Sequence, residues 1–80
     1  MNKTTHRHIF MIRCVPVDTL GERSTTERLA EQVMAAGFNV SYRTIERDLV
    51  SFTGQYGIMR ERDEHGFSWW YRTHALECVQ

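Results

Sequence analysis

Two arginines four residues apart are the clearest candidates for chemistry in this sequence. On a helix, Arg43 and Arg47 would lie about 40° apart around the axis, one turn from each other. A guanidinium group offers its donors in a fixed fork, which suits two phosphate oxygens or the N7 and O6 atoms of guanine. The hydroxyls of Ser41 and Thr44 lie nearby, at the expected beginning of the same helix, where free N–H groups attract anions. These residue types suit the binding of a phosphate-rich polymer.

Other kinds of chemistry lack the residues that they need. The sequence contains no HExxH, GxSxG or glycine-rich phosphate loop, and no pair of carboxylates at a useful spacing. His6 and His8 would diverge by about 160° on a helix, and no Cys-x-x-Cys accompanies them. We therefore expect a protein that is not an enzyme, with no metal, no cofactor and no small-molecule site. A small hydrolase is the most remote alternative, because nothing supplies its nucleophile and base.

Length and composition restrict the class of protein. The chain has 80 residues, of which 41% are hydrophobic and 25% charged, so we expect one small globular domain over 1–80. No apolar run approaches the roughly 18 residues of a membrane span, and the first residues lack the apolar stretch of a signal peptide. Two cysteines, Cys14 and Cys78, are too few for a disulfide framework. A cytoplasmic location is therefore expected.

The charges balance, which limits how the protein could bind nucleic acid. Ten basic and ten acidic residues give no net charge, and the pI is about 6.9. Binding by bulk charge is therefore not expected, and any binding must depend on where the charges lie. Near-zero net charge also implies weak binding by a single copy of the domain.

Three helices are predicted before residue 57. The first covers about 5–15, with Thr4 or Thr5 as its cap, and ends before Pro16. The second covers about 25–36, where Ser24 and Glu27 have the spacing of a capping box and Gly37 is placed to end the helix. The third helix covers about 41–56.

The third helix would have one buried and one exposed face. Four apolar side chains fall together on the side opposite Arg43 and Arg47, and are expected to face the core: Ile45, Leu49, Phe52 and Tyr56. The alternative is that the arginine face is simply the solvated side of an amphipathic helix, partly neutralised by Glu46. Asp48 is expected to be a structural carboxylate that accepts hydrogen bonds from a neighbouring arginine or a free N–H group.

A β-hairpin is predicted after the third helix. Its strands cover about 58–62 and 67–72, and Gly66 is expected to have a positive φ in the turn. The fold class is therefore mainly α (α+β), a winged helix-turn-helix with three helices followed by a two-stranded β-hairpin wing. Arg60 and Arg62 share one face of the first strand and would approach a flanking minor groove, although an ordinary charged hairpin is the alternative.

The aromatic residues of the second strand alternate between its two faces. Phe67, Trp69 and Tyr71 are expected to pack against the helices, which leaves Trp70 partly exposed. An exposed Trp70 could stack on single-stranded nucleic acid, but one exposed ring is a small platform for that purpose.

Residues 24–49 resemble the DNA-binding half of the DeoR-type winged helix-turn-helix in WYL-domain transcription regulators. The segment 41–49, SYRTIERDL, is similar to the recognition-helix signature of that family, and the resemblance covers about 3–72. It implies sequence-specific binding of double-stranded DNA in transcription regulation, with the third helix in the major groove. It also implies a homodimer in the full-length regulator, formed through other domains.

The resemblance and the residue types together define the expected DNA-binding side chains. They are Ser41, Tyr42, Arg43, Thr44 and Arg47 on the third helix, Thr26 at the start of the second helix, and Arg60 and Arg62 on the hairpin. A protein-interaction module on the same fold is the alternative, because a fold does not determine a function.

The chain departs from the family pattern in its length. WYL regulators continue into a ligand-sensing domain, whereas this chain stops at Gln80. We expect either a naturally short relative or a DNA-binding domain excised from a longer regulator, and the character of residues 73–80, a tail or the start of a linker, favours excision.

Overall fold

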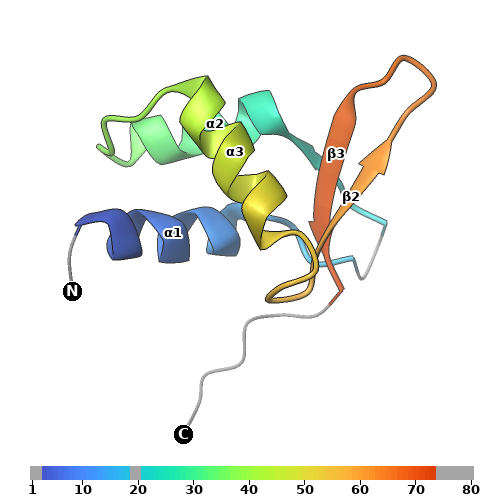
Figure 1. Ribbon diagram of the computed structural model, residues 1–80, viewed down its shortest axis with the longest axis horizontal. Helices are drawn as coiled ribbons and strands as arrows, with labels where there is room; N and C mark the ends of the chain where they lie inside the picture. The colour runs from blue at the N-terminus through green and yellow to red at the C-terminus, as the bar shows by residue number, and fades with distance from the viewer. Residues whose placement is uncertain (1–2, 19–20, 74–80) are drawn as a thin grey trace, which may run out of the picture.

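The computed structural model describes residues 3–18 and 21–73 (Figure 1). Its elements follow in the order α1 (Lys3–Cys14), β1 (Ser24–Thr25), α2 (Thr26–Ala35), α3 (Tyr42–Phe52), β2 (Ile58–Arg62) and β3 (Ser68–Arg72). Three helices are followed by an antiparallel β2–β3 hairpin, which confirms the predicted winged helix-turn-helix α+β fold. None of the helices in the described ranges is long and apolar enough to cross a membrane.

The turn between α2 and α3 is defined by local capping contacts. Gly37 follows α2 with a φ of +100°, and its N–H donates to the Met34 carbonyl, as the sequence predicts for the end of this helix. Ser41 is the N-cap of α3, where its Oγ accepts from the Thr44 N–H at 3.2 Å. Five residues therefore separate the end of the α2 cap from the first residue of α3, and the two helices pack against each other.

The predicted cap of α2 was wrong by one residue. Thr25, not Ser24, is the N-cap, and its hydroxyl accepts from the Arg28 N–H at 3.2 Å. Ser24 instead pairs with Trp70 in the short strand β1, which the sequence analysis did not predict. Ser24 is buried in β1, while Thr25, the last residue of β1, lies directly before the first residue of α2 and caps the helix.

Two predicted helix bounds also change. α1 begins at Lys3, so Thr4 and Thr5 lie inside the helix and do not cap it. α3 ends at Phe52 rather than near residue 56, because the chain turns sharply toward β2: the Gly54 N–H donates to the Ile58 carbonyl at 2.8 Å. Tyr56 lies in this turn with a φ of +54° and is half exposed, so it does not continue the buried face of α3.

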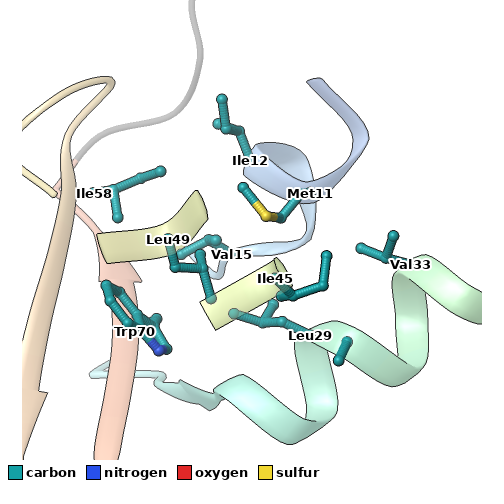
Figure 2. Packing of buried hydrophobic residues seen from close by; sticks show 10 residues of the cluster. Met11, Ile12, Val15, Leu29, Val33, Ile45, Leu49, Ile58 and Trp70 are labelled. Atoms are coloured by element: carbon teal, nitrogen blue, oxygen red, sulfur yellow. The ribbon is translucent and has the colours of Figure 1, made fainter. Parts of the chain in front are cut away.

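The hydrophobic core forms where the three helices meet the inner face of the sheet (Figure 2). Its buried members come from every helix and both long strands: Met11, Ile12, Val15, Leu29, Ala30, Val33, Ile45, Leu49, Ile58 and Trp70. Ile45 and Leu49 are fully buried on α3, as predicted from its periodicity. Burying each such side chain contributes about 1.5–3 kcal/mol.

The sheet reverses the predicted faces of the tryptophans. Strand order is β1-β3-β2, so β3 is the central strand, and Trp70 lies opposite Ser24 on one side and Arg60 on the other. Trp70 is completely buried, and its indole N–H donates to the Thr26 hydroxyl at 2.8 Å. Trp69 is only half buried, so the expectation that it packs in the core while Trp70 is partly exposed was wrong.

Arg72 also points inward from this face of β3. It shares the face of Trp70, is 6% exposed, and donates from Nε to the Val15 carbonyl at 2.9 Å. Val15 directly follows α1, so the guanidinium lies at the negative end of the helix dipole. Burial lowers the pKa of Arg72 from its ordinary value, while this contact provides an acceptor for part of its charge.

Candidate nucleic-acid interface

Arg43 and Arg47 lie on the exposed side of α3. Both side chains are exposed, while Ile45 and Leu49 on the opposite side are fully buried. No ion pair links either arginine, or Glu46, to another residue within 4–18 and 21–73. The interpretation in which Glu46 neutralises the arginines therefore has no contact to support it, and both guanidinium groups are available to an incoming ligand.

The beginning of α3 brings hydroxyls and free N–H groups beside these arginines. The Ser41 and Thr44 hydroxyl oxygens are 3.1 Å apart, and Ser41 already accepts from the Thr44 N–H. Helix geometry leaves the N–H groups of Tyr42 and Arg43 without an acceptor inside the helix. The predicted group of Ser41, Tyr42, Arg43 and Thr44 thus lies together at one end of α3, and Tyr42 is 47% exposed.

Thr26 is buried, unlike the other residues that were predicted to bind DNA. Its side chain is 3% exposed, and its hydroxyl accepts from the buried indole of Trp70. The Thr26 side chain therefore belongs to the core, and the expectation that it contacts DNA is corrected. In the sequence it resembled an exposed residue at the start of a helix, because nothing local indicated that Trp70 faces inward.

The hairpin projects beside α3. In Figure 1 the hairpin turn and the first residues of α3 both lie toward the top of the view, with the first turn of α2 between them. Residues of all three segments line one groove. The register places Arg60 opposite Trp70 and Arg62 opposite Ser68, so the two arginines share one face of β2, as the alternation predicts. This is the inner face of the sheet, which carries the buried Trp70, and not the outer face that the sequence indicated. Arg60 Cζ lies 5.6 Å from the centroid of the Trp70 ring, and both arginines remain exposed.

Asp63 organises the hairpin turn. Its Oδ1 accepts from the N–H groups of His65 and Phe67, each at 2.9 Å, and its Oδ2 accepts from the Trp69 indole N–H at 3.0 Å. Gly66 has the predicted positive φ, +85°. The indole hydrogen bond is the largest cause that lowers the pKa of Asp63 below its ordinary value of 3.8, followed by the backbone donors.

This network predicts a turn that loosens in acid. A carboxyl group whose pKa is lower in the folded protein stabilises the fold above its unfolded pKa, and that contribution is lost as the pH falls through the folded pKa. We expect the turn to be intact at neutral pH and to open below the ordinary pKa of 3.8. The Trp69 indole N–H resonance, followed by NMR during acid titration, should move with Asp63 and stay still in Asp63→Asn. Equal titration in both proteins would contradict this.

Asp48 fixes α3 against α1. Its Oδ2 accepts from Arg7 at 2.7 Å and lies 3.3 Å from His8 Nε2, while the His8 and Phe52 rings meet edge to face with centroids 5.1 Å apart. The prediction that Asp48 is a structural carboxylate is confirmed. Arg7 is committed to this contact, so it is not a free cation for a phosphate.

One residue beside the interface was not predicted from the sequence. Phe67 precedes β3 and is 65% exposed, more than any other large hydrophobic side chain in the part of the chain that the structure describes. Together with Tyr42, Glu46 and Arg62 it lines a groove between α3 and the hairpin. Alternation along the strand assigned Phe67 to the core, and its position next to Gly66 in the turn was the available signal that it could lie outside the sheet.

Comparison of this chain with protein-family models, with curated proteins and with solved structures finds no match. The winged-helix topology therefore stands on the structure itself. Within the described part of the chain, no group of three histidine, cysteine, aspartate or glutamate side chains is placed to hold a metal ion.

Proposed function

We propose that this chain binds double-stranded DNA sequence-specifically, in transcription regulation, with α3 in the major groove. The observation that carries the proposal is the exposed pair Arg43 and Arg47, which project from the side of α3 opposite the core and form no ion pair in the described ranges. An α-helix fits the major groove, where an arginine can donate to both N7 and O6 of guanine. Binding without catalysis is part of the proposal.

The rest of the interface supports this orientation. Residues at the beginning of a recognition helix usually meet the base edges, and both arginines lie in the first two turns of α3. Arg62 lines the same groove as Tyr42 and Glu46 of α3, and Arg60 shares its face of β2, so both arginines are placed to contact phosphates that flank the α3 surface. Membership in the DeoR-type WYL regulators, which the segment 41–49 suggests, is a finer part of the same proposal.

Two copies would be needed for useful affinity. The formal net charge is zero, so a single domain gains little long-range attraction to DNA. A homodimer formed through other parts of a longer regulator would read two half-sites about 34 Å apart, or a multiple of that distance.

The proposal is tested by selecting duplexes from a random pool and mapping the guanines that binding requires. The selected duplex, labelled with fluorescein, is compared with duplexes in which single guanines are replaced by 7-deazaguanine. We expect one or two guanines whose replacement weakens binding by about tenfold or more, since each good bidentate contact is worth about 1–3 kcal/mol. Failure to enrich any duplex, or binding that tolerates every replacement, contradicts the proposal.

A protein-interaction module is the second candidate, favoured by the exposed apolar side chains of Tyr42, Val50 and Phe67 near the same surface. Salt distinguishes the two functions. DNA binding weakens with a log–log slope of about −0.9 for each phosphate neutralised, whereas an apolar protein contact has a shallow dependence.

A further inference from the structure

A groove of about 270 Å³ separates α3 from the hairpin. Tyr42 lines it from α3 and Phe67 from the hairpin, and these two aromatic side chains are 47% and 65% exposed. The groove therefore has one aromatic ring on its α3 side and one on its hairpin side, while residues 25–27 at the beginning of α2 form its third wall.

Phe67 is held in place by its own backbone. Its N–H donates to Asp63 Oδ1 at 2.9 Å, and its carbonyl accepts from the Asp63 N–H at 3.0 Å. The other oxygen of the same carboxylate is held by the indole of Trp69. A ring presented on such an ordered turn loses little further freedom when a partner covers it, so more of the burial energy appears as affinity.

The charged side chains that line the groove do not favour the binding of phosphate groups. Arg62 contributes one guanidinium group, while Glu27 and Glu46 contribute two carboxylates. A phosphate strand passing through the groove would gain one attraction and meet two repulsions. The aromatic rings are therefore the main source of favourable contact in this part of the interface.

We propose that the Phe67 and Tyr42 rings pack against the apolar faces of deoxyriboses in one sugar–phosphate strand of the duplex. The inference rests on the proposed function, because a helix in the major groove is bordered by a sugar–phosphate strand on either side. The groove is bordered by the beginning of α3 on one side and by the hairpin on another, so a strand that passes on the hairpin side of α3 would cross it. Every nucleotide carries a deoxyribose, so this contact does not depend on base sequence.

Phe67→Ala tests the contact by fluorescence polarization with two labelled duplexes, one selected from a random pool and one of arbitrary sequence. The variant should bind both duplexes about fivefold to tenfold more weakly, as expected when roughly 50 Å² of apolar surface is no longer buried. The slope of log Kd against log salt should be unchanged. Arg62→Ala, by contrast, should reduce that slope by about 0.9.

Met59→Ala is the matched control. Met59 is also exposed on the hairpin, but it pairs with Tyr71 on the opposite face of the sheet, so its removal should leave binding unchanged. Circular dichroism checks that each variant is folded. Unchanged affinity in Phe67→Ala would overturn the inference, as would a loss confined to the selected duplex. The proposed function fails separately, if removal of Arg43 and Arg47 leaves selective binding intact.

Discussion

Replacing Arg43 and Arg47 together by alanine is expected to weaken binding to a selected duplex by about a hundredfold or more, since each bidentate contact contributes about 1–3 kcal/mol. Both side chains are exposed and form no ion pair in the described ranges, so their removal should not destabilise the fold. The melting temperature should therefore stay close to that of the wild type. Polarization with a fluorescein-labelled duplex, repeated at several salt concentrations, measures the effect.

Two matched variants separate base reading from charge. Arg43→Lys with Arg47→Lys keeps both positive charges but removes the fork of donors, so binding to arbitrary sequence should persist while selectivity falls. Arg13→Ala removes an exposed cation from α1 and should have a small effect. If the double alanine variant discriminates between duplexes as the wild type does, α3 does not read the bases.

The helix-turn-helix could be predicted because its signals are local. Gly37 ends α2 through its positive φ, Ser41 caps α3 with its own side chain, and Ile45 and Leu49 repeat at the helical period. Each of these signals depends on residues within a few positions of one another. The same periodicity predicts the exposed arginine face of α3. The centre of the candidate site could therefore be predicted from the sequence.

Most of the predictions that were wrong concern features that are determined by residues far apart in the sequence. The N-cap of α2 is Thr25, whereas Ser24 pairs with Trp70 in the sheet. The Thr26 side chain was expected at the surface, but the indole of Trp70 holds it in the core. The end of α3 depends on a hydrogen bond from Gly54 to Ile58 that no periodicity reveals.

The face of β3 was the hardest feature to predict. Trp69, Trp70 and Tyr71 are consecutive, so an aromatic side chain lies on each face and alternation alone does not identify the inner one. In the structure, the face that carries Trp70 and Arg72 is the buried one, and Trp70 packs in the core with side chains of all three helices. A shift of register by one residue would reverse the assignment.

Alanine substitutions of Trp69 and Trp70 test which face of β3 is buried. Trp70→Ala should cost about 3–5 kcal/mol, because a fully buried ring is lost from the core and a cavity remains. The Thr26 hydroxyl would also lose the indole N–H that it accepts from. Since a domain of this size has a stability of about 4–12 kcal/mol, the variant should lose a large part of its stability and unfold at a much lower urea concentration than the wild type.

Trp69→Ala should be much milder, at about 1–2 kcal/mol, because its ring is half buried and its indole contacts Asp63 in the turn. Trp70→Phe is the control that keeps most of the apolar volume and removes the hydrogen bond to Thr26, so it should fall between the wild type and Trp70→Ala. Urea unfolding followed by circular dichroism gives all three values. If Trp69→Ala were the more damaging change, the buried face of β3 would be the face of Trp69. Arg60 and Arg62 would then point away from α3, and the groove proposed to hold the DNA strand would not form.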